Sequence, residues 1–234
     1  MRKILIASII TVFAMLEALA QTPGEFARRV CGVSETDTVA VVPRGVKEIP
    51  DYGFYGLSSL RRVELPEGVE KIGRSAFAWC DSLREVRLPK SLTDIGAHAF
   101  AYCERMERAD LPPRLRHIGN NAFSRCLALR SAEVPASVTE LESYAFSDCV
   151  SLRRATLPAN KSLLGELIFS GCLNLRELRC MSPVPPPFDC ASFIFEPDEE
   201  TLYRRCVLVV PATGAASYRD AHGWSLFRDI SAEP

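Results

Sequence analysis

Residues 83–105 read LREVRLPKSLTDIGAHAFAYCER, and this stretch decides the fold. From Leu83 to Leu88 the apolar residues at the fourth and sixth positions alternate with charged ones, which is typical of a short β-strand with one face in water. Pro89 ends the strand, because proline cannot donate a ladder hydrogen bond and restricts the residue before it. The first third of the stretch therefore predicts a short strand that stops at the proline.

The rest of the stretch predicts a bend and a compact apolar segment. Gly96 suits a left-handed or crowded backbone position. Ala99, Phe100 and Cys103 follow with the spacing of the inner face of one or two helical turns. We therefore expect short helical segments opposite the strands, with Phe100 in the core.

The same pattern recurs every 23 residues. Three residue types form columns with this spacing: Pro43, Pro66, Pro89, Pro112, Pro135 and Pro158; Phe54, Phe77, Phe100, Phe123, Phe146 and Phe169; Cys80, Cys103, Cys126, Cys149 and Cys172. A single unit cannot bury its apolar residues, whereas stacking places equivalent residues about 4.8 Å apart. The sequence therefore predicts a solenoid: a curved stack of 23-residue units, with short parallel strands on one face and turns and short helical segments on the other.

The combined pattern L-x-x-V-x-L-P and I-G-x-x-A-F-x-x-C resembles the BspA-like leucine-rich repeats of bacterial surface and secreted proteins. The resemblance covers residues 38–181 as about six repeats, and residues 207–211 and 224–227 are similar to the usual ending of this family. It implies a leucine-rich-repeat solenoid with a role in adhesion or protein recognition.

The N-terminus predicts export. Residues 1–20 have the features of a secretory signal peptide: Arg2 and Lys3, an apolar stretch, and small residues at Ala18 and Ala20. The apolar stretch has about thirteen residues, fewer than the ~20 that span a bilayer, so we expect no membrane span in the mature chain. The mature protein is expected to be secreted, periplasmic or on the cell surface.

Atypical sequence at both ends of the repeats predicts caps. Residues 21–42 are expected to form an N-terminal cap, residues 38–181 the leucine-rich repeats and residues 182–234 a C-terminal cap, because the end units of a solenoid would otherwise offer an open edge. Other departures from the pattern are a glutamate in place of the bend glycine at Glu142 and a lysine at an apolar position at Lys161.

The nine cysteines of an exported protein would ordinarily suggest disulfides. Five of them form the repeat column, where side chains in register point the same way and keep their Cβ atoms farther apart than a disulfide allows. We therefore expect these five to be buried thiols beside the phenylalanine column. Cys190 and Cys206 flank a loop of the C-terminal cap, and the sequence leaves open whether they are bonded.

No catalytic or metal-binding pattern is evident. His98, His117 and His222 form no closely spaced ligand pair, and cysteines 23 residues apart with the same orientation cannot form a zinc tetrahedron. Glycine-rich phosphate loops, Gly-x-Ser-x-Gly and His-Glu-x-x-His are absent from the sequence. The sequence therefore predicts a protein that is not an enzyme, with no catalytic residue, cofactor or metal.

The solvent side of the strands is the expected binding surface. The second, third and fifth positions of each strand contribute ten arginines and six acids, about +4, whereas the chain without Arg2, Lys3 and Glu17 has 26 basic and 28 acidic residues, a net −2. An anionic protein or acidic glycan fits this charge, whereas export and the lack of interleaved aromatic residues argue against nucleic acid. The predicted partner-binding residues are Arg61, Arg84, Arg87, Arg108, Arg130, Arg153, Arg154, Arg176 and Arg179.

Two interpretations of this surface remain open. Charges alternate across neighbouring strands, as in Arg62, Glu85 and Arg108, which favours a cross-strand ladder of salt bridges in a structural spacer of the cell envelope. The second strand position, however, is arginine in five of six units, unmatched by its neighbours, which favours a binding stripe. We expect a monomeric scaffold that recognises an extracellular or cell-surface partner.

Overall fold

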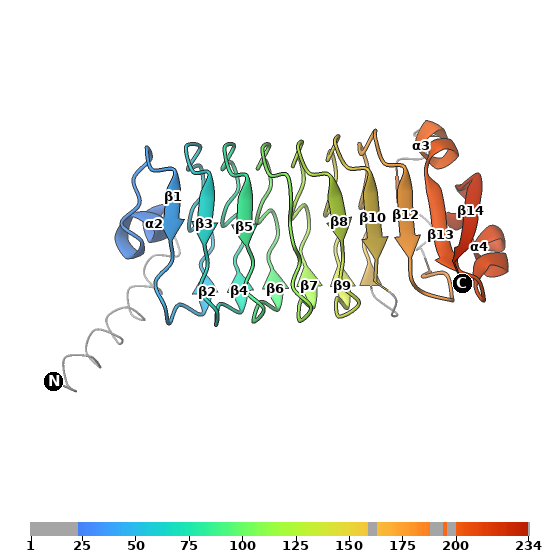
Figure 1. Ribbon diagram of the computed structural model, residues 1–234, viewed down its shortest axis with the longest axis horizontal. Helices are drawn as coiled ribbons and strands as arrows, with labels where there is room; N and C mark the ends of the chain where they lie inside the picture. The colour runs from blue at the N-terminus through green and yellow to red at the C-terminus, as the bar shows by residue number, and fades with distance from the viewer. Residues whose placement is uncertain (1–22, 159–162, 188–193, 196–199, 234) are drawn as a thin grey trace.

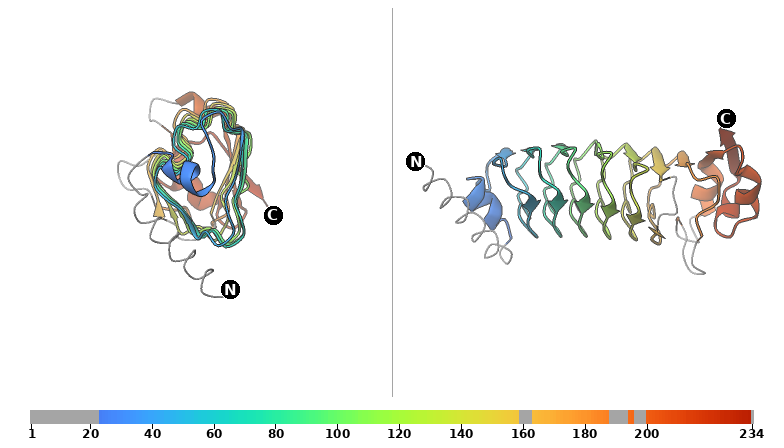
Figure 2. Two further views of the ribbon diagram at one scale, coloured as in Figure 1. Left: turned by 90° about the vertical axis from the view of Figure 1, so that its left-hand side faces the viewer. Right: turned by 90° about the horizontal axis from the view of Figure 1, so that it is seen from below.

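A computed structural model describes residues 23–158, 163–187, 194–195 and 200–233. The repeats stack side by side in one row, and successive repeats overlay when the row is viewed end-on (Figures 1 and 2). The protein is therefore a parallel-strand solenoid, as the 23-residue period predicts. The predicted signal peptide, residues 1–20, lies outside the described residues.

One strand of each repeat lies in a first ladder. Its members are β1 (Val39–Val41), β3 (Arg62–Glu64), β5 (Glu85–Arg87), β8 (Ser131–Glu133), β10 (Arg154–Leu157) and β12 (Glu177–Cys180). The ladder is divided into two parallel sheets, one ending at β5 and the other beginning at β8, because the repeat around Arg108 contributes only a single bridge, Glu85 to Arg108. Partners are 23 residues apart, as in the parallel pair Arg62 and Glu85, so the register of the ladder is the register of the sequence repeat.

A second parallel ladder of two-residue strands follows the proline of each repeat. Its members are β2 (Glu48–Ile49), β4 (Lys71–Ile72), β6 (Asp94–Ile95), β7 (His117–Ile118), β9 (Glu140–Leu141) and β11 (Leu163–Leu164). The sequence did not reveal these strands, because two residues are too few to show an alternating pattern. The isoleucines of β2, β4, β6 and β7 point inward and are fully buried.

The segments expected to be helical are successive turns. His98 and Tyr102 have φ angles of 57° and 62°, which end any right-handed helix. Their amides donate along the stack instead, to Asn120 O at 2.8 Å and Ser124 O at 2.9 Å. The spacing of Ala99, Phe100 and Cys103 therefore reflected a buried turn and not a helix.

Phenylalanine and cysteine columns fill the core. The rings from Phe54 to Phe169 stack with centroids 4.9 to 5.7 Å apart, and all six are at most 1% exposed. Each column cysteine is buried, and its thiol donates to the carbonyl of the phenylalanine 26 residues earlier, as from Cys103 to Phe77 O at 3.2 Å. Cys80, Cys103, Cys126 and Cys149 are free thiols, as predicted.

Different elements cover the two ends of the stack. Helix α2 (Glu25–Val30) closes the N-terminal end, where Phe26 meets Phe54 edge-on at 5.7 Å. The C-terminal end carries α3 (Glu200–Arg205), β13 (Val207–Pro211), α4 (Ala215–Asp220), the 3-10 helix η1 (Trp224–Leu226) and β14 (Asp229–Glu233), and β13 and β14 extend the first ladder. None of the described helices has the length and apolar character to cross a membrane. Whether Cys190 and Cys206 form a disulfide stays open, because Cys190 lies outside the described residues.

Candidate interaction surface

The first ladder presents the predicted arginines to solvent. In β3 and β5 a buried valine lies between two exposed charged residues, because successive side chains of a strand point to opposite faces. The second-position arginines lie one residue before the strands and are exposed, as at Arg84, Arg153 and Arg176. Alternation along the strand therefore separates the charged surface from the core.

The ion pairs of this surface run mainly along the strands, not across them. Four arginines pair with an acid two residues away: Arg62 with Glu64 (2.9 Å), Arg87 with Glu85 (3.1 Å), Arg108 with Asp110 (3.6 Å) and Arg179 with Glu177 (2.7 Å). The expected cross-strand pairing of Arg62, Glu85 and Arg108 is therefore wrong. Residues i and i+2 share a face, so one long side chain reaches the next along its own strand.

Arg130 and Arg179 have partners that the sequence did not indicate. Arg130, expected to be unmatched, lies 3.7 Å from Glu107, which occupies the same position in the preceding repeat. Arg179 also contacts Glu233 of β14 at 2.7 Å, a pairing between residues 54 apart that depends on how the C-terminal end folds back. The remaining five predicted arginines form no ion pair with another described residue: Arg61, Arg84, Arg153, Arg154 and Arg176.

Three of the predicted arginines surround one open hollow. Its volume is about 590 Å³, and it is lined by Arg130, Ser131, Ser151, Arg153, Arg154 and Asn174, with no carboxylate among them. Arg130, Arg153 and Arg176 occupy the same position in successive repeats, since Arg153 N donates to Arg130 O and Arg176 N to Arg153 O. Like charges on adjacent strands repel one another, so an anion in this hollow would relieve that repulsion.

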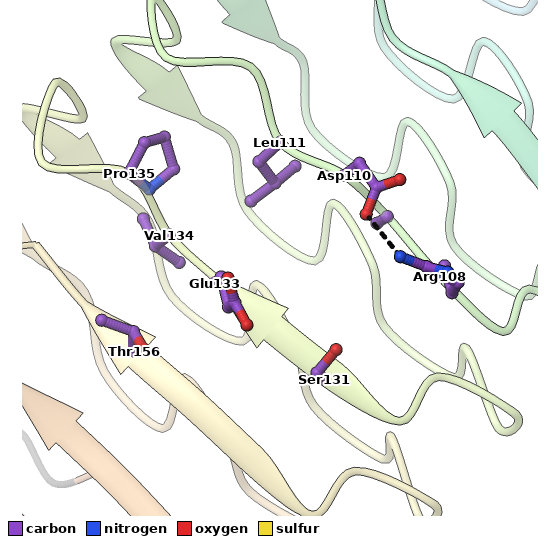
Figure 3. A pocket seen from close by; sticks show the side chains of 9 residues that line it. Arg108, Asp110, Leu111, Ser131, Glu133, Val134, Pro135 and Thr156 are labelled. Atoms are coloured by element: carbon purple, nitrogen blue, oxygen red, sulfur yellow. Dashed lines mark ion pairs between the residues drawn. The ribbon is translucent and has the colours of Figure 1, made fainter.

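Neighbouring hollows on the same surface have mixed charge. Figure 3 shows one of about 460 Å³ in which the Arg108–Asp110 pair lies across the opening from Glu133 and Thr156. The next, of about 330 Å³, is lined by Arg84, Glu85, Arg87, Glu107, Arg108 and Asp110. The hollow at Arg153 therefore differs from both in being lined by cationic and neutral polar groups alone.

A separate polar cluster surrounds His117 on the second ladder. Its ring Nε2 lies 3.0 Å from a Glu142 carboxylate oxygen, and its Nδ1 lies 4.0 Å from Asp94. His117, Glu140 and Glu142 each have one potential metal-ligand atom within 4.8 Å of those of the other two residues. The cluster is not evident in the sequence, because its members are 23 and 25 residues apart and only stacking brings them together.

Hydrogen bonds hold the Glu142 side chain at a position where neighbouring repeats have glycine. A Cβ at the preceding bend glycine, Gly119, would lie 2.6 Å from Ala97 N of the repeat before it, so this column ordinarily requires glycine. Glu142 instead reaches back and accepts a hydrogen bond from Asn120 N at 2.7 Å. Partial burial opposes ionisation, but the hydrogen bonds from His117 and Asn120, together with the His117 charge, outweigh it and lower the pKa of Glu142.

The repeats identify the family. The family description "BspA type Leucine rich repeat region" matches residues 41–182 in six copies. The chain is a BspA-type leucine-rich repeat protein. No curated protein sequence is similar enough to count as a relative.

Solved structures include similar bacterial proteins. The Treponema pallidum leucine-rich repeat protein is 38% identical, with a TM-score of 0.59 over 61% of this chain and 69% of that one. The pneumococcal vaccine antigen PcpA is 21% identical, with a TM-score of 0.50 over 85% of this chain and 42% of that one, which is a likeness of fold alone.

Proposed function

We propose that this chain is an exported interaction scaffold, not an enzyme, which binds a protein or an acidic glycan through the strand-lined arginine surface. The observation that carries the proposal is the hollow lined by Arg130, Arg153 and Arg154 without a carboxylate. Arginine donates several N–H groups in a planar fork that matches carboxylate and sulfate oxygens. Arg153 and Arg154 have no ion-pair partner among the described residues, so their guanidinium groups remain available to a ligand.

The buried thiols support a role without catalysis. A cysteine nucleophile must be partly exposed and ionised near neutral pH. Burial raises the pKa of Cys80 to about 12 and that of Cys103 well above its ordinary value, and both side chains are fully buried. These cysteines therefore suit packing and hydrogen bonding, not chemistry.

A structural spacer of the cell envelope is the second candidate. It is favoured by the pairs Arg62–Glu64, Arg87–Glu85 and Arg108–Asp110, which neutralise three arginines of the N-terminal half of the surface without a ligand. In that case the arginine hollow would only be hydrated.

Binding measurements on the mature protein separate the two candidates. Heparin serves as the acidic glycan probe and polyglutamate as the acidic polypeptide probe, each titrated at several salt concentrations. An interaction scaffold of the proposed kind binds at least one of them saturably, with affinity that falls as salt rises, because salt screens exposed charges. Absence of saturable binding to both probes and to extracellular host and bacterial fractions would favour the spacer.

A further inference from the structure

A stack of four side chains lies outside the first-ladder strands, and none of its residues lines the hollows of the arginine surface. In the turn segments that precede the first-ladder strands, the rings of Trp79 and Tyr102 lie parallel with centroids 3.9 Å apart. The guanidinium of Arg125 covers the other face of Tyr102 at 5.3 Å, and Arg125 pairs with Asp148 at 3.9 Å. These residues are 23 apart and therefore occupy one column of the solenoid.

The backbone of this column favours glycine. Its φ angles are positive in every repeat: 73° at Gly56, 63° at Trp79, 62° at Tyr102, 60° at Arg125, 56° at Asp148 and 72° at Gly171. Bulky side chains are rare in this left-handed region. Glycine at both ends of the column meets the backbone requirement, whereas the tryptophan, tyrosine and arginine between them adopt it as non-glycine residues, as Tyr52 and His98 do at another turn position of the repeat.

The N-terminal end of the stack is open. Trp79 is 44% exposed, and among the described residues Tyr102 is the aromatic ring that stacks on it. The next position in the column is Gly56, where an added Cβ would meet nothing within 4 Å. The space next to Gly56, from which a side chain would extend over the outer face of Trp79, therefore contains no protein atom.

Two carboxylates beside the stack indicate the charge of a ligand. Asp81 and Glu104 follow Trp79 and Tyr102 by two residues, are partly buried, and form no ion pair with another described residue. Partial burial, and after it the charge of Glu104, raise the pKa of Asp81. A cation at the outer face of Trp79 would be attracted by the indole ring, and the two acidic residues make the charge of this turn region favourable to a cation.

The stack itself contains an example of such an arrangement. Arg125 lies on the second face of Tyr102 and pairs with a carboxylate, Asp148, in the same column. We propose that the outer face of Trp79 above Gly56 binds the guanidinium or ammonium group of a basic side chain, arginine foremost, on a partner protein. Such a ligand would complete an Arg–Trp–Tyr–Arg column. This site is independent of the arginine surface and has the opposite charge preference.

Fluorescence of the mature protein tests the proposal. Trp224 is fully buried and its Nε1 donates to Pro186 O at 2.9 Å, so a ligand at the surface changes the emission of Trp79 alone. The probes are a short Gly-Arg repeat peptide, the same peptide with neutral citrulline in place of arginine, and chitohexaose. We expect a saturable change with the arginine peptide and at least five-fold weaker binding of the citrulline peptide.

Two substitutions make the test specific. Gly56→Tyr places a ring in the open position, in the same left-handed backbone conformation that Trp79 and Tyr102 adopt, and it should abolish the response. Gly56→Ala is the matched control, since it changes the same backbone without filling the space, and it should retain the response. The double variant Asp81→Asn, Glu104→Gln should bind the arginine peptide at least five-fold more weakly.

Several results would overturn the proposal. Equal responses to the arginine and citrulline peptides would show that charge is not recognised. A response to chitohexaose alone would assign the site to a sugar, and a response that persists in Gly56→Tyr would place the ligand elsewhere. No saturable response to any probe, in a protein whose circular dichroism matches the fold, would exclude the site.

Discussion

The Glu142 carboxylate accepts a hydrogen bond from His117 Nε2 at 3.0 Å, although the two residues are 25 positions apart. The contact exists because Glu142 replaces a bend glycine and its side chain reaches back over the preceding repeat, where Asn120 N donates to its other oxygen. The glutamate that departs from the repeat pattern is thus stabilised by residues of the preceding repeat, which only the stacking brings close.

This contact predicts a pH dependence of stability. The pKa of folded Glu142 lies below its ordinary value of 4.5, so the ionised form stabilises the fold fully above that value, and the stabilisation is lost as pH falls through the lower folded pKa. Glu142→Gln should therefore reduce the free energy of unfolding near neutral pH and flatten its decline in acid. Urea unfolding across acidic and neutral pH measures this.

The control for this prediction is Glu133→Gln, which alters an exposed carboxylate of β8. It should leave the acid dependence unchanged. An acid dependence in Glu142→Gln identical to that of the natural protein would show that the His117 contact contributes nothing.

Phe123 is expected to be the most sensitive core position of the central stack. Its ring lies between those of Phe100 at 5.2 Å and Phe146 at 5.1 Å and is fully buried. Phe123→Ala opens a cavity that neighbouring repeats cannot fill, and we expect a loss of about 3–5 kcal/mol in unfolding free energy by urea denaturation. Phe123→Leu, which keeps more of the volume, should cost less; equal losses would contradict the stacking account.

The column thiols should be reduced and protected. Burial and the raised pKa of Cys80 and Cys103 keep the thiolate scarce, so iodoacetamide should leave them unmodified in the native protein at about pH 8 and label them in guanidinium without reductant. Mass spectrometry of the digests checks both states. A recovered Cys80–Cys103 crosslink would contradict the packing of the column.

Export predicts a defined mature N-terminus. If residues 1–20 are a signal peptide, the protein recovered outside the cytoplasm should begin at Gln21. Intact mass and N-terminal sequencing of the secreted or surface fraction measure this, and Ala18→Arg, Ala20→Arg should block cleavage because both small residues are lost. An exported protein that retains Met1 would contradict the prediction.

The sequence determined the fold more fully than the surface. The phenylalanine column is evident in the sequence, because each Phe packs against its equivalent 23 residues later. The same period therefore predicts both the buried core residues and the register of the strands. The spacing of Ala99, Phe100 and Cys103 predicts a helix around Phe100, whereas the positive φ angles at His98 and Tyr102, which make it a turn, do not alter the apolar periodicity.

Side-chain pairs on the solvent-exposed surface are harder to predict from the sequence. Arg62 could have reached Glu85 across the ladder or Glu64 along the strand, and only the geometry shows the second. The Trp79–Tyr102 stack is not evident in the sequence, because Gly56, Arg125 and Asp148 share its column and no single residue type repeats there. Arg179 and Glu233 are joined by the end of the chain folding back, which no repeat encodes.

The most direct test of the binding surface compares two charge reversals on opposite halves of it. Arg153→Glu, Arg154→Glu alters the hollow without carboxylates, whereas Arg62→Glu, Arg87→Glu makes the same change in charge where each arginine already pairs within its strand. The affinity of each folded variant is measured against whichever acidic probe binds the natural protein, at matched salt. We predict that the first variant loses at least ten-fold in affinity and the second less than three-fold, with little change in either thermal midpoint. Equal losses in both variants, or none in the first, would contradict the account.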